Sequence, residues 1–566
     1  MELIDYPLKY QRHATRVVHI GHVAIGGDNP ICIQSMLTAA TGDVAGCLQE
    51  IRSLQEVGCG LIRLAIPARM DLERIPELRR VLQEEGINIP LIADIHYSPQ
   101  LALDACELFE KIRINPGNYS DNPKSVNRQT DGNYFAEGHE KLKEAIQPLS
   151  EKLKKFGNSL RIGVNQGSLS SRMMERYGDS PQGMVQSALE MVALFEALDF
   201  FQIVVSLKSS NPITVQKAYR LLVAEGPETN AVPLHLGVTE AGNELMGRIK
   251  SLVGMGSLLT DGIGDTFRVS LTEPAANEVV FAKELIEAVN RSINAGEADK
   301  GSWCRPVDHL RMKNRLFTSS GVDIGSGSPL KIGKQSGSSL PKTEIAVEAD
   351  FSFEVDGETV IIGNERFQAM SRRKLWWKEP ISKNQSGIVL DSKLSLRELR
   401  AYYRHHEGKA ESSAIGMIYP IDSDMADEIH VGAILSEGLL DFLLIPAEIE
   451  AEAMTRLLTL LQAARARILT TEYITCPSCA RTLFDIESTV NSIKKQTRHL
   501  KGVKIGVMGC IVNGPGEMAD ADFGYVGSGK GKIDLYFGQD KVERGIDEKD
   551  AVEKLIGLIK EKGRWS

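Results

Sequence analysis

Three cysteines near the end of the chain have a spacing that suits one metal centre. Cys476 and Cys479 lie three residues apart, so both can reach one centre from a single turn. Cys510 ends a predicted strand and leads into a glycine-rich stretch, where backbone N–H groups can approach inorganic sulfides. The pattern predicts an iron–sulfur cluster.

Other uses of these cysteines stay open. A structural zinc site normally closes with four ligands from paired motifs, and the sequence has neither a second CxxC nor an HxxxH. A thioredoxin-like redox pair would need only Cys476 and Cys479. A buried pair without a role is a third alternative.

Three thiolates leave a cluster one ligand short of the usual four. Glu517 lies seven residues after Cys510, across a loop that can fold back, and is the candidate for the fourth position. A carboxylate is a harder ligand than a thiolate, so iron holds it less firmly and could exchange it for a substrate oxygen. From spacing alone, Glu517 could also be a charge at the start of a helix.

A second set of polar residues lies at the ends of predicted strands in the first half of the chain. Within a strand they are spaced by two, so they share one face. The candidate substrate-binding residues are Arg63, Arg113, Asn115, Arg161, Asn165, Lys208, His235, Arg268 and Ser270. Four arginines and a lysine exceed what Asp94 and Glu240 can neutralise, and uncompensated buried cations are costly. Because arginine suits bidentate phosphate recognition, we expect a phosphorylated small molecule here.

Three residues of the same set are candidate catalytic groups. Glu240 follows the seventh predicted strand, where a carboxyl group among apolar neighbours keeps its proton and could pass it to a leaving hydroxyl. Taken alone, Glu240 could equally be a helix-starting carboxylate. Asp94 and His96 lie two residues apart at the end of the third strand.

The elements that must position these residues alternate between strand and helix. Short apolar runs each precede an amphipathic stretch, which implies parallel strands with helical crossovers. Eight such units close into a (β/α)8 TIM barrel, whose chemistry lies at the C-terminal strand ends. The predicted strands are residues 32–36, 61–66, 91–95, 111–115, 160–165, 202–208, 234–239 and 265–271.

Local signals add detail to this barrel. Asn211 and Pro212 predict a helix start, since Asn caps and Pro fits the first turn. Periodicity predicts one helix over residues 70–85, and residues 16–27 predict a hairpin outside the barrel.

The pattern changes along the chain, so we expect an α/β protein of three domains. Residues 1–294 form the TIM-barrel substrate domain, and a linker composition follows it. Residues 295–467 form a central α/β insertion domain. Residues 468–566 form a small α+β domain that holds the iron–sulfur cluster.

Composition limits the class of protein. The net charge is -9 and no basic tract stands out, which argues against a nucleic-acid partner. No apolar run is long enough for a transmembrane helix, and the first residues lack a secretory pattern, so we expect a cytoplasmic protein without membrane contact. Eight cysteines in 566 residues are too few for a disulfide scaffold. The other five, which are scattered, are expected to be small buried hydrophobes.

These motifs resemble the 4-hydroxy-3-methylbut-2-enyl diphosphate synthase family, the reductive enzymes late in the non-mevalonate isoprenoid route. The resemblance covers the barrel and the last domain, and the 509–517 loop is its most specific part. The matching segments are residues 33–36, 93–96, 113–118, 161–165, 234–237, 239–242, 262–266, 475–479 and 509–517.

The resemblance implies a reaction on 2-C-methyl-D-erythritol 2,4-cyclodiphosphate. Two electrons and protonation would open the cyclic diphosphate and expel a hydroxyl as water, giving 4-hydroxy-3-methylbut-2-enyl diphosphate. It implies Glu240 as the acid/base group and ferredoxin or flavodoxin as the electron donor. It places the diphosphate on Arg63, Arg113, Arg161, Lys208 and Arg268.

The resemblance also implies a [4Fe-4S] cluster. Its ligands would be Cys476, Cys479, Cys510 and Glu517, and the iron bound by Glu517 would take the substrate oxygen.

The insertion departs from the short two-domain form of the family and resembles the three-domain version of plants and some bacteria. In the two-domain form, a dimer lets one chain's cluster domain cap its partner's barrel. A homodimer therefore stays open here, and so does an arrangement in which the cluster domain reaches its own barrel. The family's insert is often likened to a second barrel, which the partial βα pattern permits.

Two rival functions remain at this stage. A pterin- or corrinoid-linked barrel transferase would need no three-cysteine site. A non-catalytic iron–sulfur sensor would need no anion-binding mouth.

Overall fold

The structure is a computed structural model, and it describes residues 10–119, 134–227, 230–239, 244–271, 273–294, 317–319, 322–324, 330–357, 359–370, 387–390, 414–476, 481–511, 516, 518 and 520–565. The chain folds into two compact units. The larger comprises residues 13–251, 263–284 and 470–566, and the smaller comprises residues 1–12, 252–262 and 285–469. The predicted domain boundaries at 294/295 and 467/468 stay predictions.

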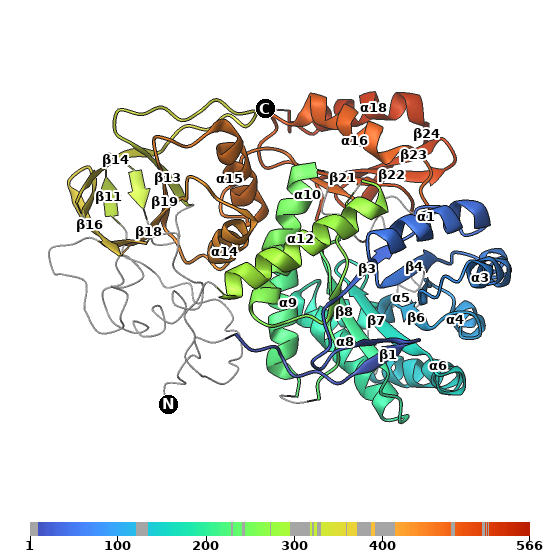
Figure 1. Ribbon diagram of the computed structural model, residues 1–566. Coiled ribbons are helices and arrows are strands. Elements are labelled where there is room, and N and C mark those ends of the chain that lie inside the picture. Colours follow the sequence, from blue (N-terminus) through green and yellow to red (C-terminus); the bar gives the residue numbers. More distant parts are fainter. Residues whose placement is uncertain are drawn as a thin grey trace. The chain divides into compact units, whose positions relative to one another are not determined.

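The larger unit contains an eight-stranded parallel barrel (Figure 1). Its strands are β3 (Cys32–Met36), β4 (Leu61–Ala65), β5 (Leu91–Asp94), β6 (Lys111–Ile114), β7 (Ser159–Asn165), β8 (Ile203–Lys208), β9 (His235–Leu236) and β10 (Thr266–Phe267). They pair in the order β8-β7-β6-β5-β4-β3-β10-β9. A parallel bridge between Val205 and Leu234 joins the two ends of this sheet. The predicted TIM barrel is confirmed, although β9 and β10 are shorter than expected.

Helices lie outside these strands, as Figure 1 shows for α1, α3, α4, α6 and α8. Their bounds are α1 (Val44–Glu56), α2 (Arg69–Leu72), α3 (Ile75–Glu84), α4 (Pro99–Ala105), α5 (Pro116–Tyr119), α6 (Tyr134–Phe156), α7 (Ser171–Tyr177), α8 (Pro181–Glu196), α9 (Pro212–Glu225), α10 (Glu244–Ser251) and α12 (Ala275–Asn294). The predicted start at Asn211 is confirmed, because its Oδ1 accepts a hydrogen bond from the Ile213 N–H at 3.0 Å. Among the described residues, no helix is both long and apolar enough to cross a membrane.

The single helix expected over residues 70–85 is wrong. The structure has two helices there, α2 and α3, and Pro76 lies in the first turn of the second. Proline has no N–H to donate, and its ring would clash with the carbonyl four residues earlier. The chain therefore restarts its helix at Ile75.

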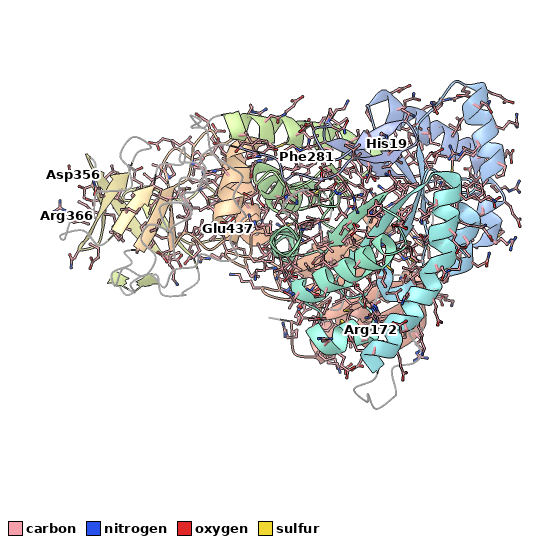
Figure 2. All side chains as sticks on the ribbon, turned by 90° about the horizontal axis from the view of Figure 1, so that it is seen from below. His19, Arg172, Phe281, Asp356, Arg366 and Glu437 are labelled. Atoms are coloured by element: carbon pink, nitrogen blue, oxygen red, sulfur yellow. The ribbon has the colours of Figure 1, made fainter. Side chains whose placement is uncertain are left out.

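A hairpin seals the N-terminal end of the barrel. It consists of β1 (Val18–Ile20) and β2 (Val23–Ile25), which pair antiparallel. Val18 and Ile20 join one apolar cluster with residues from the first two positions of three barrel strands, Leu61, Ile92 and Val204. The intervening His19, labelled in Figure 2, is exposed. Because apolar side chains fill the N-terminal end of the barrel, we expect the polar site at the C-terminal ends of the strands.

The smaller unit contains a second closed barrel, of seven strands. They are β13 (Lys331–Gln335), β14 (Phe351–Asp356), β15 (Thr359–Ile362), β16 (Glu365–Met370), β17 (Gly387–Leu390), β18 (Ala414–Ile418) and β19 (Phe442–Ile445). Strands β14, β15 and β16 pair antiparallel, and the other pairs are parallel. The unit also holds the hairpin β11 (Phe317–Ser319) and β12 (Val322–Ile324), and the helical segments η2 (Leu252–Gly256), α11 (Ser257–Thr260), α14 (Met425–Ser436) and α15 (Ala451–Ala463).

The last part of the larger unit is a five-stranded sheet with two helices. Its elements are β20 (Glu472–Thr475), α16 (Ile486–Thr497), β21 (Lys504–Met508), β22 (Phe523–Gly529), β23 (Lys532–Phe537), β24 (Asp540–Asp547) and α18 (Glu548–Glu561). The order is β20-β21-β22-β23-β24, with the first three strands parallel. The predicted α+β unit is confirmed. Strand β24 was missed because it is a largely exposed edge strand without an apolar alternation.

Candidate active site

Charged residues of three neighbouring strands meet inside the first barrel. The strand register places Asp94 of β5 beside Arg113 of β6, and Arg113 beside Arg161 of β7. All three side chains are buried. Period-two spacing then carries His96 to the same side, as the sequence predicted.

Asp94 is the hub of this group. Its carboxylate lies 3.3 Å from Arg113 Nη1, 3.9 Å from Arg161 Nη2 and 3.5 Å from His96 Nε2. Burial alone would raise the pKa of Asp94, but the charges of Arg63 and Arg113 outweigh burial and hold that pKa well below its usual range. Asp94 is therefore ionised at neutral pH and is not a proton donor.

His96 is neutral at the same pH. Burial, then the charge of Arg113, lower the pKa of His96 to about 4. Its Nε2 lies 2.6 Å from Arg113 Nη1, so the neutral ring accepts a hydrogen bond from the guanidinium. Asp94 and His96 together orient Arg113, which also donates to the Gly163 carbonyl at 3.0 Å.

Arg268 has an internal counter-ion that sequence reasoning missed. Glu278 of α12 accepts from Arg268 Nε and Nη2, both at 3.1 Å. The same carboxylate accepts from the Leu271 N–H at 3.0 Å and from Ser35 Oγ at 3.1 Å. With only Asp94 and Glu240 as expected counter-ions, the predicted surplus of positive charge was too large by one, because Glu278 neutralises Arg268.

Buried positive charge still exceeds negative charge among the described residues of the barrel mouth. Arg63 contacts the Met36 sulfur at 2.9 and 3.2 Å, and burial followed by the repulsion of Arg268 lowers its pKa to about 10, so it stays charged at neutral pH. Lys208 is buried, and burial followed by the repulsion of Arg161 holds its pKa well below the usual lysine value. Among the described residues, neither group forms an ion pair with a carboxylate, and an entering anion would stabilise the charged forms of both.

Lys111 is a further cationic group in the same barrel. It begins β6 two residues before Arg113, and its Nζ is buried without a hydrogen-bond partner among the described residues. Burial, then the charge of Arg161, hold its pKa well below the usual value. The period-two spacing that indicated Arg113 was a signal that could have found it.

The remaining predicted residues of the mouth have structural contacts. Asn115 donates to Ser168 Oγ at 2.9 Å and accepts from the Gly117 N–H at 3.0 Å. The carbonyl of Asn165 accepts from the Ser168 N–H at 3.2 Å, and Ser270 is buried. These contacts shape the turns that follow β6 and β7.

His235 lies on β9 in the barrel interior. Its Nδ1 is 3.5 Å from Arg161 Nη1, and the Tyr219 hydroxyl donates to its carbonyl. Burial, then the charge of Lys208, lower the pKa of His235 well below its usual value, so it is neutral. Glu240 lies outside the described residues.

Two of the predicted metal ligands end neighbouring parallel strands. Strand β20 pairs with β21, and the Cys476 N–H donates to the Val507 carbonyl at 3.4 Å. Cys476 and Cys510 are both half-buried. The Gly509 N–H donates to Cys476 Sγ at 3.1 Å, which favours a thiolate at that position. Cys479 and Glu517 lie outside the described residues.

The other described cysteines are not suited to be thiolate ligands. Burial raises the pKa of Cys47, Cys59 and Cys106 to about 12 and that of Cys32 to about 11. These thiols are protonated at neutral pH and bind metals poorly. Cys304 lies outside the described residues.

Two described residues close in sequence to the predicted ligands, Arg481 and Gly516, touch the barrel within the larger unit. Arg481, two residues after Cys479, donates from Nη2 to the Asp94 carbonyl at 3.1 Å. A Cβ added to Gly167, in the turn after β7, would lie 1.8 Å from the Gly516 carbonyl oxygen, so these two backbones are in direct contact. Neither contact was anticipated from the sequence.

Comparison with known proteins agrees with this geometry. The model described as "GcpE TIM-barrel domain" matches residues 15–283, and "GcpE protein C-terminal domain" matches residues 472–561. A relative from Akkermansia muciniphila, named 4-hydroxy-3-methylbut-2-en-1-yl diphosphate synthase (flavodoxin), is 41% identical over 99% of this chain and 98% of its own length.

Two further relatives carry similar names. The Leptospira interrogans protein, also a "(flavodoxin)" synthase, is 37% identical over 99% of this chain and 98% of its own length. The Oryza sativa protein, a "(ferredoxin), chloroplastic" synthase, is 35% identical over 98% of this chain and 88% of its own length. With a cationic barrel mouth, cysteine loops at its rim and relatives that match over nearly their full length, the chain belongs to the GcpE family of 4-hydroxy-3-methylbut-2-en-1-yl diphosphate synthases.

Proposed function

We propose that this chain catalyses the reductive ring opening and dehydroxylation of 2-C-methyl-D-erythritol 2,4-cyclodiphosphate to 4-hydroxy-3-methylbut-2-enyl diphosphate. The relatives named above carry the name of the synthase that makes this product. The observation in the structure that supports the proposal is the surplus of buried cations in a barrel whose other end is sealed.

The diphosphate would bind to Arg63, Arg113, Arg161 and Lys208. Among the described residues Arg113 and Arg161 share one carboxylate, Asp94, and Arg63 and Lys208 have no ion pair, so burial of these charges is costly and phosphate oxygens would offset that cost. Each charge-assisted hydrogen bond contributes roughly 1.5–3 kcal/mol. Arg268 belongs to the same predicted set, but Glu278 already neutralises it, so we expect a smaller contribution from it.

Asp94 and His96 were predicted as catalytic groups, but neither is suited to donate a proton to the departing hydroxyl. Asp94 is ionised and His96 is neutral, so both act by orienting Arg113. The proton for the departing hydroxyl would come from Glu240, the carboxyl group that the family resemblance indicates.

We further propose that Cys476, Cys479, Cys510 and Glu517 hold a [4Fe-4S] cluster. The hydrogen bond from the Gly509 N–H to the Cys476 sulfur and the shared strand edge of Cys476 and Cys510 support this donor set. When bound, such a cluster would pass on the two electrons of the donor, one at a time, and would offer a site for the substrate oxygen. The relatives' names indicate ferredoxin or flavodoxin as the electron source.

Several predictions about organisation remain proposals. They are the three domains 1–294, 295–467 and 468–566, a cytoplasmic location and a homodimer. The relatives' names do not support the rival transferase and sensor functions.

Anaerobic purification followed by iron and sulfide analysis tests the cluster, and turnover of the cyclodiphosphate with a one-electron donor tests the reaction. We expect about four irons per chain and formation of the allylic diphosphate. Cys510→Ser should lose the iron, and Glu517→Ala should keep part of it while losing most turnover. Colourless, iron-free protein from oxygen-free preparation would refute the proposal.

A further inference from the structure

Arg481 is a buried cation that the proposed chemistry does not use. It follows Cys479 by two residues in the sequence, and its side chain is 8% exposed. Its Nη2 donates to the Asp94 carbonyl at 3.1 Å, and its Nη1 lies 3.6 Å from Asp94 Oδ2. A guanidinium that has lost most of its water needs a compensating anion, and Asp94 is that anion.

Asp94 is shared with the barrel's own cations. Arg113 and Arg161 approach the same carboxylate at 3.3 and 3.9 Å. A diphosphate bound to these two guanidinium groups would share their charge and leave more of the Asp94 charge to Arg481. Anion binding in the mouth and docking of the cysteine loop would then favour one another, because coupling between two binding events is reciprocal.

A second contact joins Gly516, six residues after Cys510, to Gly167 in the turn that follows β7. A Cβ on Gly516 would lie 2.5 Å from the Gly167 carbonyl oxygen, and a Cβ on Gly167 would lie 1.8 Å from the Gly516 carbonyl oxygen. Gly516 directly precedes Glu517. The two contacts therefore hold Arg481 and Gly516, which lie close in sequence to the proposed ligands Cys479 and Glu517, at the barrel.

We propose that Arg481 is a positioning residue, which docks the cysteine loop onto the mouth of its own barrel by pairing with Asp94, and that the Gly167–Gly516 contact completes the dock. The proposal rests on the proposed function for its kinetic consequences. The docking itself is measurable without turnover.

The test compares Arg481→Met and Arg481→Lys with the wild-type holoenzyme. Arg481→Met removes the charge but keeps the length of the side chain. We expect iron content and cluster reduction by dithionite to stay at the wild-type level. Oxidation of the reduced cluster by added cyclodiphosphate should slow about ten- to a hundred-fold, the loss of one charged hydrogen bond. Arg481→Lys should recover part of that rate.

Gly167→Ala tests the contact between Gly167 and Gly516 with a change in the barrel, away from the proposed cluster ligands. Its Cβ would meet the Gly516 carbonyl, so we expect a similar loss of rate with full iron. Gly178→Ala is the matched control: Gly178 also has a positive φ, of 66°, but a Cβ there meets nothing within 4 Å. Arg544→Met, at an exposed arginine of β24, controls for loss of charge.

Hydrogen exchange separates failure of this inference from failure of the proposed function. We expect amides of residues 164–168 to exchange faster in Arg481→Met than in wild type, and not in Arg544→Met. Unchanged exchange together with a rate within twofold of wild type overturns the inference and leaves the function standing. Loss of rate in strict proportion to loss of iron overturns it as well, since Arg481 would then serve cluster assembly. A wild-type protein without iron or turnover refutes the function, while the exchange comparison still decides the dock.

Discussion

The barrel of β3–β10 and the barrel of β13–β19 are filled with different kinds of side chain. In the first, Asp94, Arg113 and Arg161 lie in one layer. In the second, the rings of Phe367 and Phe442 pack edge to face at 5.2 Å between centroids.

Glycines make room for the aromatic filling of the second barrel. A Cβ on Gly416 would lie 2.0 Å from the Phe442 ring, and one on Gly333 would lie 2.3 Å from the Phe351 ring. A fully buried phenylalanine stabilises a fold by about 1.5–3 kcal/mol. Apolar packing therefore contributes to the stability of the second barrel, whereas the first carries buried cations that an anion would stabilise. We therefore expect a scaffold role for the second barrel and a binding role for the first.

The largest expected effect is on the second barrel. Phe442→Ala should lower the free energy of unfolding of the smaller unit by about 3–5 kcal/mol, because the cavity cannot be refilled. Calorimetry measures the change. Turnover below the unfolding transition should be unaffected, and a loss under 1 kcal/mol would contradict the packing argument.

The opposite behaviour is expected in the first barrel. Arg161→Met should lower kcat/KM by about ten- to a hundred-fold, since it removes a phosphate contact. Stability should stay the same or rise, because a buried charge is removed. Denaturant unfolding and steady-state kinetics on the same preparation check both.

Arg172, labelled in Figure 2, is the matched control for Arg161. It is also buried, but it has its own carboxylate partner, with Arg172 Nη1 at 2.8 Å from Glu190 Oε1. Arg172→Met should destabilise the fold by roughly 1.5–3 kcal/mol, since Glu190 loses the guanidinium and keeps only His139, at 2.7 Å. Stabilisation by this change, or destabilisation by Arg161→Met, would remove the distinction between paired and surplus cations.

An anion should stabilise one barrel and not the other. At a hundred times its dissociation constant, inorganic pyrophosphate should add about 2.7 kcal/mol to the larger unit through mass action. Differential scanning calorimetry would show one transition moving and the other staying in place. Equal shifts of both transitions would indicate a non-specific salt effect instead.

Acid should weaken the first barrel through His96. Its pKa falls from 6.5 to about 4 on folding, so the folded state binds fewer protons than the unfolded state between these values. This contribution to stability is present above pH 6.5 and is lost as the pH falls towards 4. Unfolding free energies measured from pH 7 to 4 should fall less steeply in His96→Gln, and parallel curves would contradict the assignment.

The smallest effect is expected on the outside of the second barrel. Asp356 and Arg366, labelled in Figure 2, are both exposed, on β14 and β16. Asp356→Asn and Arg366→Gln should each change stability by less than about 0.5 kcal/mol. A larger change in activity would show that this surface has a role beyond scaffolding.

Local sequence signals predicted much of the first barrel. All eight strands and the Asn211 cap follow from apolar runs, polar strand ends and the Asn-Pro pair. Closure of the second barrel was not predicted, because β14–β16 run antiparallel inside an otherwise parallel barrel and strand pairing is a long-range property.

Residue types and their spacing in the sequence determined which groups could do chemistry: cations two apart at strand ends, and cysteines at the ends of neighbouring strands. Only the tertiary structure decided which of the cations are surplus. Glu278 neutralises Arg268 from α12, and Arg481 reaches Asp94 from a segment 387 residues away. Electrostatic energy depends on distance and burial, and the fold sets both by bringing together residues that the chain keeps far apart.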